Sequence, residues 1–563
     1  MHLEKMRGAA SRTALVAALF AFAGPVAAEE GFSSDELLVS RTQFPTSFNA
    51  VVAGTTLLPP GCVGTNCVTA VAGSTYPLVF NNAPVDGSFG LTSKIVLDRY
   101  SPEGRRVGSI EIPNSLSKGV TSTSDQMVAS FSSKSELALN LSADGRYLTF
   151  TGYFAPIGAV DVSNSNTPGV VDATNPVSSA YYRLVATMDA RGHLRFTKTN
   201  AYSGNNSRAA IFENTHGHNE FLMSGNAGNG ANPQPNGVIL GAGAQIETPN
   251  FASLANQPDP GQPTPVGSFN ITQLGDKADK TGKDTNFRGL TVFDNVVYFT
   301  KGSGGNGINT VYFIDTSGVD TLGRPLACPN GVGVPAPGAK LPSGPMSYTS
   351  ASLQTLGVYP YNMCVLKGFP TTPAKKATAF PFGVWFANAT TLYVADEGDG
   401  TNTFANGVYT AAAASKTAGL QKWVYNAAQG QWTLAYVLQA GLNLGVPYTV
   451  ANYPTGINTA TKLPWAPATG GLRNITGRVN RDGTATIFAI TSTVSGSGDQ
   501  GADPNSLVAI KDSLAATTLP ASESFNSLRV AKSGEALRGV SFAPGGEMRG
   551  TGDGWQVRKR WDD

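Results

Sequence analysis

The chain has little charge and no marked excess of either sign. Of its 563 residues, 14% are charged, and 40 Lys and Arg nearly balance 38 Asp and Glu. Residues 1–28 contain three of the basic and one of the acidic residues, so the remainder is close to neutral. A neutral chain lacks the broad basic surface that attracts nucleic acid. We therefore expect no nucleic-acid partner.

Long apolar runs are missing beyond the N-terminus. Lys5, Arg7 and Arg12 precede the apolar segment Ala14–Ala23, and small residues stand at positions 26–28. This order predicts a signal peptide over residues 1–28. The segment is too short to cross a bilayer, and no later run is long enough. We expect an exported, soluble protein, periplasmic or extracellular, with no membrane span.

Motifs that diagnose an enzyme class are also missing. The chain has only four histidines, and it contains no Gly-x-Ser-x-Gly elbow and no His-Glu-x-x-His pair. No glycine loop has the spacing of a phosphate-binding loop. The chain therefore has few residues that could form a serine hydrolase triad.

Cysteines are few: Cys62, Cys67, Cys328 and Cys364. The first pair flanks a short loop and the second brackets a segment rich in Pro and Gly. In an oxidising compartment this favours two loop-stapling disulfides, although four cysteines allow three pairings. A metal site made of all four cysteines is the weaker alternative, because the usual paired Cys-x-x-Cys spacing is absent.

Glycine (65) and proline (35), by contrast, are abundant. They separate short apolar segments, as expected for strands joined by tight turns. Phe287–Phe293 followed by Val296–Thr300 shows this arrangement, and so does Phe382–Phe386 followed by Thr391–Asp396. Such units recur along the chain and predict an all-β repeat protein.

The last unit is incomplete. Leu537–Pro544 predicts a strand that no second strand follows, and its partner is available only in Leu37–Phe44. A C-terminal strand completed by an N-terminal one closes a ring of blades and removes exposed edges. We therefore predict a β-propeller over residues 29–549, with a polar tail over 550–563. Six blades fit the unit starts, and seven remain open. A β-sandwich or a β-helix is the structural alternative, but neither explains this completion from end to end.

Long loops are predicted on one face of this ring. They enter the inner strands or join the second and third strands of each unit, whereas the opposite face has tight turns. Long loops on a rigid scaffold indicate a binding face. The predicted loops are Arg41–Ser93, Gly152–Ser178, Gly225–Asn236, Gly302–Asn309, Asp396–Gly407 and Thr493–Asn505.

Arginines recur at the start of the predicted inner strands. They are Arg208, Arg288, Arg473 and Arg538. If the strands align, four guanidinium groups meet at one channel mouth, where their donors suit carboxylate, sulfate, phosphate or sugar hydroxyl groups. The alternative is structural: each arginine ties neighbouring blades together through carbonyl oxygens or an acidic partner.

Acidic residues collect in the loops on the same face. Asp396, Glu397 and Asp399 follow one second strand, and Asp499 and Asp503 lie in the matching loop of the next unit. We predict Asp396, Glu397 and Asp499 as acid or base groups. We predict Asp396, Asp399, Asp499 and Asp503 as ligands of a Ca²⁺ ion, since calcium takes oxygen ligands from such loops. A solvated loop is the alternative.

The arrangement of these units resembles that of secreted six-bladed propellers, which include gluconolactonase-like lactonases and calcium-dependent phytase-like hydrolases. Phe386–Gly400 and Leu472–Asn505 look most like an uncharacterised group of exported bacterial propeller proteins. The lactonase-like members hold calcium in the channel with carboxylate and Asn ligands, so the resemblance implies a calcium site in the channel.

We therefore expect a monomer that binds, and potentially hydrolyses or cleaves, a small polar or anionic ligand such as a sugar acid, lactone or phosphoester. A metal-assisted hydrolase, lactonase or lyase is the enzymatic form of this hypothesis. The alternative is a non-enzymatic extracellular module whose loops bind a protein or a glycan.

Overall fold

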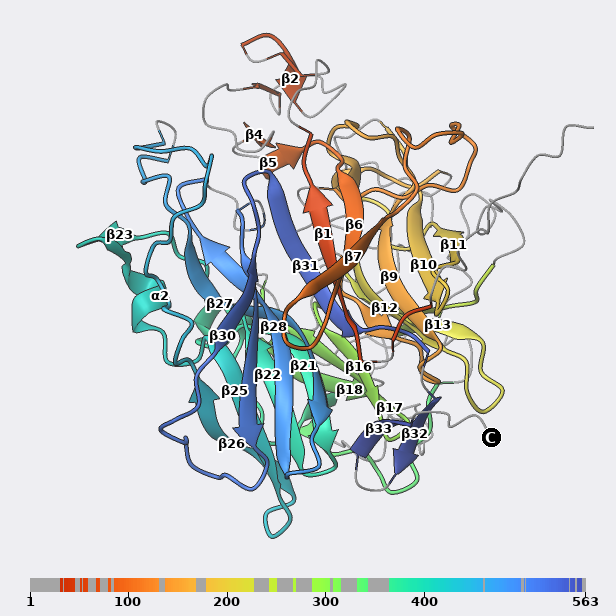
Figure 1. Cartoon of the computed structure of the whole chain (residues 1–563), viewed down its shortest axis with the longest axis vertical. Coiled ribbons are helices and arrows are strands. Elements are labelled where there is room, and N and C mark those ends of the chain that lie inside the picture. Colours follow the sequence, from red (N-terminus) through yellow and green to blue (C-terminus); the bar gives the residue numbers. More distant parts are fainter. Residues whose placement is uncertain are drawn as a thin grey trace, which may run out of the picture.

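The computed structural model is all-β. It describes residues 31–33, 35–45, 51–52, 54–58, 67–70, 79–82, 86–130, 137–168, 179–226, 243–250, 267–269, 286–303, 307–314, 332–342, 364–458, 461–497, 501, 503–545, 547–551 and 554–558. The described strands form six main sheets arranged as the blades of a ring (Figure 1). The predicted six-bladed β-propeller is confirmed.

The first three blades each contain four strands, which follow one another from the ring axis outward. Blade 1 is β31 (Glu535–Phe542), β1 (Leu37–Gln43), β6 (Lys94–Tyr100) and β7 (Arg106–Glu111). Blade 2 is β8 (Asn140–Leu141), β9 (Tyr147–Tyr153), β10 (Arg183–Asp189) and β11 (Leu194–Thr199). Blade 3 is β12 (Ser207–Glu213), β13 (Glu220–Gly225), β14 (Ala244–Glu247) and β15 (Gly267–Phe269).

The other three blades follow the same plan. Blade 4 is β16 (Leu290–Phe293), β17 (Val296–Lys301), β18 (Thr310–Ile314), β20 (Cys364–Leu366) and β19 (Val332–Gly333). Blade 5 is β21 (Pro381–Asn388), β22 (Thr391–Asp396), β25 (Gly419–Asn426) and β26 (Gln431–Leu438). Blade 6 is β27 (Ala468–Val479), β28 (Thr484–Val494), β29 (Ser506–Ser513) and β30 (Asn526–Val530).

Smaller elements lie in the connections. Three short pairs are β2 (Leu57–Leu58) with β3 (Val68–Thr69), β4 (Val79–Asn82) with β5 (Asp86–Gly90), and β23 (Phe404–Ala405) with β24 (Val408–Tyr409). Among the described residues, the helical elements are η1 (Val162–Asn164), η3 (Ala374–Lys376) and α2 (Thr410–Ala414). In the part of the chain that the structure describes, no helix has the length and apolar character to cross a membrane.

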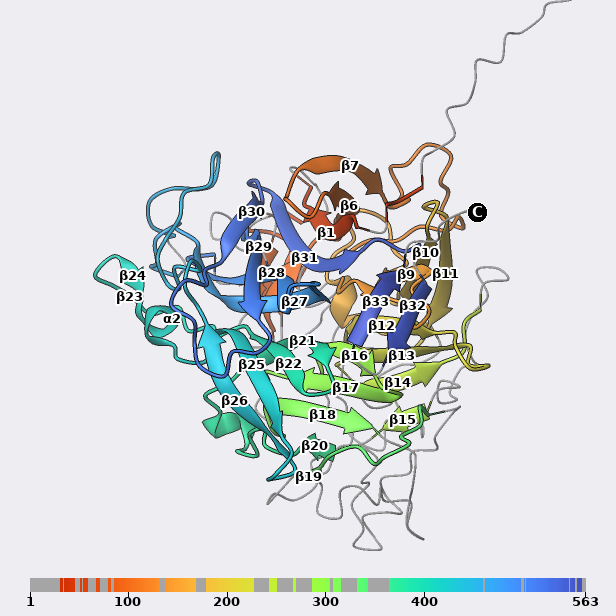
Figure 2. The same ribbon diagram turned by 60° about the horizontal axis from the view of Figure 1, so that its bottom comes forward.

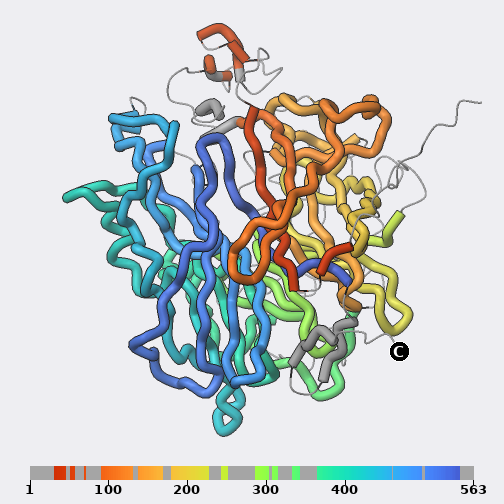
Figure 3. The backbone as a smooth tube through the Cα atoms, viewed as in Figure 1, coloured from red at the N-terminus to blue at the C-terminus, as the bar shows by residue number. Residues whose placement is uncertain are grey.

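The ring is closed by the two ends of the chain. β1 pairs antiparallel with β31, with Leu37 opposite Phe542 and Val39 opposite Val540, and its other edge pairs with β6. Figures 1 and 3 show this as a red strand beside a blue one. The predicted completion of the last unit by the N-terminal strand is therefore confirmed, and it leaves β1 without an open edge.

Local sequence explains why the blades form. β17 and β18 are buried along their whole length, since each sheet is covered on both faces by its neighbours. The turn between β16 and β17 is Asp294-Asn295, and both residues have positive φ, 49° and 58°. Two-residue hairpin turns require such angles, which Asp and Asn tolerate better than most residues.

The hydrophobic core lies between blades rather than on the ring axis. One cluster joins Tyr393 and Leu420 of blade 5 to Ile487 and Val508 of blade 6, and similar clusters fill the other five interfaces. The inner strands surround the axis, as Figure 2 shows. The loops after the second strands and the starts of the inner strands share one end of the ring, which we call the loop end, and the hairpin turns form the turn end.

Three details differ from the sequence-based expectation. The inner strand of blade 2 is only two residues long, because Leu137 has a φ of 65° and leaves the extended region. β27 begins at Ala468 rather than Leu472. Residues within and next to the expected polar tail form a hairpin of β32 (Glu547–Thr551) and β33 (Gly554–Arg558), and β33 contacts β21 and β27. The expected strand Gly237–Leu240 lies outside the described residues.

Candidate functional site at the loop end of the channel

The starts of the inner strands touch one another around the ring. A Cβ atom added at Gly289, Gly383 or Gly539 would collide with a carbonyl oxygen of the next inner strand, belonging to Phe382, Arg473 and Leu137 respectively. Asn474 Nδ2 also donates to the carbonyl oxygen of Arg538 at 2.7 Å. These contacts put one position of each inner strand in phase. In blade order that position holds Arg538, Leu137, Arg208, Arg288, Phe382 and Arg473.

The four predicted ligand-binding arginines thus share one end of the channel. Each is buried, with 3–8% of its surface exposed. For Arg288, Arg473 and Arg538 this alignment follows from the contacts between glycine and backbone, because only glycine allows two strands to approach so closely.

Arg288 and Arg473 converge on one carboxylate. Glu397 Oε2 accepts a hydrogen bond from Arg473 Nε at 3.1 Å, and Glu397 Oε1 lies 3.9 Å from Arg288 Nη2. The ring of Phe382 lies between the two guanidinium groups, 5.5 Å from Arg288 Cζ and 5.6 Å from Arg473 Cζ. Burial lowers the pKa of Arg288; Glu397 opposes this shift and Arg473 adds to it. Two cations thus flank one aromatic ring and share one acid.

Arg208 and Arg288 also contact neutral groups. Arg208 Nε donates to Asn206 Oδ1 at 2.9 Å, and its Nη1 donates to Asn286 Oδ1. Arg288 Nη2 donates to Ser303 Oγ. Because Asn286 leads into blade 4, the Arg208 contact ties blade 3 to blade 4. Arg208 therefore has the structural role of tying neighbouring blades together. Arg288 and Arg473 have the same role through their shared partner Glu397.

Asp396 ends β22 and is fully buried. Its carboxylate accepts hydrogen bonds from the backbone N–H of Phe380 at 2.8 Å, that of Gly398 at 2.9 Å, and Gln421 Nε2 at 3.1 Å. Burial raises the pKa of Asp396 to about 7, against the effect of the two backbone donors. Asp396 thus organises the loop that presents Glu397.

The other predicted acidic residues lie apart from this pair. Asp399 is exposed and caps the backbone N–H of Thr401 at 2.9 Å. Asp503 is buried and accepts hydrogen bonds from Ser495 Oγ at 2.6 Å, Ser497 Oγ at 3.0 Å and Tyr453 Oη. Asp499 lies outside the described residues. Among the described residues, no group of three or more His, Cys, Asp or Glu side chains has the geometry of a metal site. The calcium ligands remain a prediction.

Two of the four cysteines are described. Cys67 and Cys364 are disulfide-bonded rather than free thiols. Cys62 and Cys328 lie outside the described residues, so the pairing of the four cysteines stays a prediction.

Phe382 was not anticipated from the sequence as a member of this site. Its signal was nevertheless present, because Phe382-Gly383 occupies the place that Arg288-Gly289 and Arg538-Gly539 occupy in other blades. Aligning the units on the glycine instead of on the arginine would have identified it. Ser303 and Asn286 carry no such signal, because they lie after β17 and before β16 and not at the repeated position of the inner strands.

Comparison with known proteins adds no family to this description. The chain matches no model of a known protein family, and no curated protein is significantly similar to it. The site itself is therefore the basis on which a function can be assigned to this chain.

Proposed function

We propose that this chain is a binding protein for a small anionic ligand, held at the loop end of the channel by Arg288, Arg473 and their neighbours Arg208 and Arg538. The observation that carries the proposal is the placement of four buried arginines at one register position around a single channel, two of them sharing Glu397. Planar guanidinium groups recognise carboxylate, sulfate and phosphate groups with paired hydrogen bonds.

Binding is better supported than catalysis. Asp396, the predicted acid or base, has its carboxylate occupied by two backbone N–H groups and Gln421. Glu397 is held by arginine. A general acid or base must reach the reacting atom, and these contacts hold both groups in structural roles. We further propose that the site hydrolyses a lactone or phosphoester with the help of Ca²⁺ and Asp499. We also propose that the chain is exported and that it is related to secreted lactonase-like propellers.

The test uses a charged ligand and a neutral one of the same shape. Gluconate, sulfate and phosphate are expected to raise the unfolding temperature of the full chain, since a ligand that binds only the folded state stabilises it. Sorbitol, which has the hydroxyl groups of gluconate without its carboxylate, should not.

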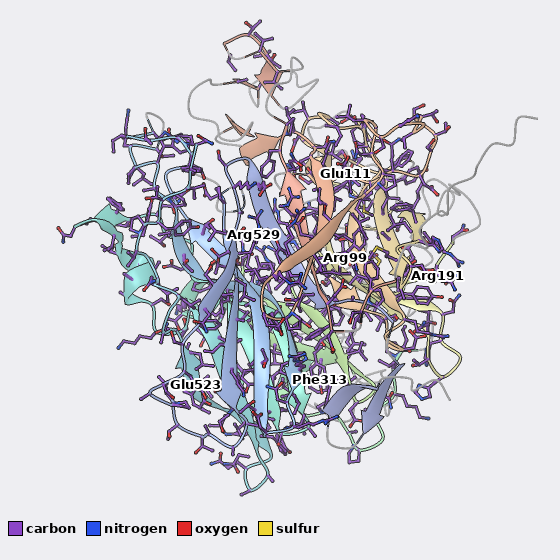
Figure 4. The ribbon with its side chains drawn as sticks, in the orientation of Figure 1. Arg99, Glu111, Arg191, Phe313, Glu523 and Arg529 are labelled. Carbon is purple, nitrogen blue, oxygen red and sulfur yellow. The ribbon has the colours of Figure 1, made fainter. Side chains whose placement is uncertain are left out.

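Arg473→Gln should weaken gluconate binding, measured by calorimetry at 25 °C, by about tenfold or more, because a hydrogen bond to a charged group contributes about 1.5–3 kcal/mol. The matched control is Arg191→Gln, an exposed arginine at the outer edge of blade 2 (Figure 4), which should bind as the unmodified chain does. If none of the three anions binds, or if Arg473→Gln binds gluconate normally, the proposal fails and a protein- or glycan-binding module becomes the better hypothesis.

A further inference from the structure

The turn end of the channel contains a cavity that the arginine site does not include. Its volume is about 320 Å³, and every blade contributes to its lining. The contributing side chains include Leu139, Ile211, Val292, Trp385, Ile475 and Phe542. Small-molecule sites are typically clefts of about 300–1,000 Å³ that are lined mainly by apolar and aromatic side chains. The cavity meets that description.

The cavity is separate from the arginine site. β27 supplies Arg473 to the loop end and Arg478 to the cavity. These residues lie five positions apart on one extended strand, so their Cα atoms are separated by about 16 Å at roughly 3.3 Å per residue. A small ligand bound at one end therefore does not contact the other.

Aromatic rings in fixed positions line the cavity on both faces of β21. Trp385 lies against the backbone of β27, where a Cβ atom added at Gly477 would come within 2.7 Å of its ring. Its other neighbour is Tyr393, stacked at 5.8 Å between ring centroids. Phe293 and Phe386, from blades 4 and 5, stack at 4.5 Å with 9° between their planes. Trp385 and Phe293 are half-buried, so part of each ring remains accessible. Flat rings in fixed positions favour a planar aromatic ligand.

The polar part of the lining carries a positive excess. Among the described lining residues, Arg478 and Arg481 stand against one acidic residue, Asp35. Within the described part of the chain, neither arginine has a carboxylate within salt-bridge distance, Arg478 interacts electrostatically with the exposed carboxylate of Glu103, and the buried Nε of Arg478 has no hydrogen-bond partner. A buried donor is stabilised by an acceptor, and an anionic acceptor suits guanidinium best.

We propose that this cavity is a second binding site, which takes a small aromatic organic anion. Its ring lies against Trp385 and Phe293, and its carboxylate or sulfonate meets Arg478 and Arg481. The aromatic rings of the lining and its positive excess jointly select this class over a neutral aromatic molecule and over an inorganic anion.

Two fluorescent probes that differ by one charged group test the proposal. 1-Anilinonaphthalene-8-sulfonate is the aromatic anion, and N-phenyl-1-naphthylamine is its neutral parent. In titrations of the full chain, the sulfonate should bind with a stoichiometry of one and quench the fluorescence of Trp385. The contribution of Trp385 is the part of the tryptophan fluorescence that is lost in Trp385→Phe. Sulfate, which fits the arginine site, should not compete.

Arg478→Gln is expected to weaken binding of the sulfonate by about tenfold, since the charged contact is lost. The affinity for the neutral probe should stay within about twofold of that of the unmodified chain. Arg191→Gln is the matched control. Thr476→Trp fills the cavity from β27 and should abolish binding of both probes while the circular dichroism spectrum stays unchanged. If Arg478→Gln affects both probes equally or neither, or if folded Thr476→Trp binds the sulfonate normally, the proposal is wrong. Arg478→Gln decides the question even if Thr476→Trp does not fold.

Discussion

At the loop end, individual acidic residues hold the loops in place, although their residue type suggested a chemical role. Asp396 is acidic and close to the channel, and both features favoured a chemical role. Its two oxygens instead accept hydrogen bonds from the segments on either side of it, at Phe380 and Gly398. A carboxylate used this way positions its neighbour Glu397 between Arg288 and Arg473.

Asp396 also predicts how stability changes with pH. Burial raises its pKa from the ordinary value of 3.8 to about 7, and the nearby Glu397 and Asp399 carboxylates contribute to the rise. Between these two values the folded state binds more protons than the unfolded state, so the free energy of unfolding falls as the pH increases and levels off above about pH 7.

The measurement is the unfolding temperature of the unmodified chain and of Asp396→Asn from pH 4.5 to 8. At pH 4.5 the variant should be less stable by about 1–3 kcal/mol, because its amide nitrogen faces an N–H donor, and this deficit should shrink as the pH approaches 7. Its unfolding temperature should fall less steeply between pH 4.5 and 7. Parallel curves for the two proteins would show that Asp396 does not titrate in this range.

At the scale of elements, neighbouring inner strands are joined by backbone contacts that only glycine permits. Gly289, Gly383 and Gly539 each lie against a carbonyl oxygen of the next blade. Farther from the axis the blades are joined by polar contacts. Lys422 of β25 is fully buried, forms an ion pair with Asp512 of β29 at 2.9 Å, and donates to the carbonyl oxygen of Ser513. The same Asp512 accepts a hydrogen bond from Tyr436 Oη at 2.6 Å.

Gly383→Ala tests the contact between inner strands. The added methyl group would collide with the Arg473 carbonyl oxygen, which is part of a strand and cannot rotate away. We expect a loss of about 1–3 kcal/mol or more in the free energy of unfolding, as for other overpacked sites. We also expect weaker gluconate binding, because the shift moves Arg473.

Gly108→Ala is the control for this substitution. Gly108 lies on β7, the outermost strand of blade 1, where an added Cβ atom would make an ordinary contact at 3.6 Å with Arg99 Cδ. It should change stability by no more than about 0.5 kcal/mol. Equal effects of the two substitutions in chemical denaturation would exclude the close approach at Gly383.

At the scale of the whole molecule, the ring depends on the pairing of its first and last strands. β31 supplies Leu537, Val540 and Phe542 to the cluster between blades 6 and 1. Without it, β1 would expose a free edge, and one face of blade 6 would lose its cover. Closure thus stabilises the entire ring and not only the blade in which it occurs.

Two truncations separate this closing strand from the residues after it. A chain ending at Gly545 keeps β31, and its unfolding temperature should stay within a few degrees of the full chain. A chain ending at Gly534 lacks β31 and should lose the cooperative thermal transition and aggregate. Calorimetry would reveal both outcomes. A chain ending at Gly534 that unfolded like the full chain would show that closure is not needed.

Much of this architecture could be predicted because its determinants are local. Alternating apolar segments and turns such as Asp294-Asn295 specify strands and hairpins within a few residues. The unmatched final strand required a partner, and only Leu37–Phe44 was available. The boundaries were less certain where backbone geometry decided them, as at Leu137, whose positive φ shortens the inner strand of blade 2.

The sequence by itself therefore determined the blades and the ring closure, and it placed the arginines at a common position, whereas the structure decided between six and seven blades. The tertiary structure decided which side chains meet. Arg473 and Glu397 are 76 residues apart, and their contact depends on the register between blades, which close packing at glycine sets. The burial of Asp396, the place of Phe382 between two guanidinium groups, and the aromatic cavity at the turn end have the same origin. Each of these features is formed by residues from several blades. The sequence pattern of a single strand therefore cannot predict it.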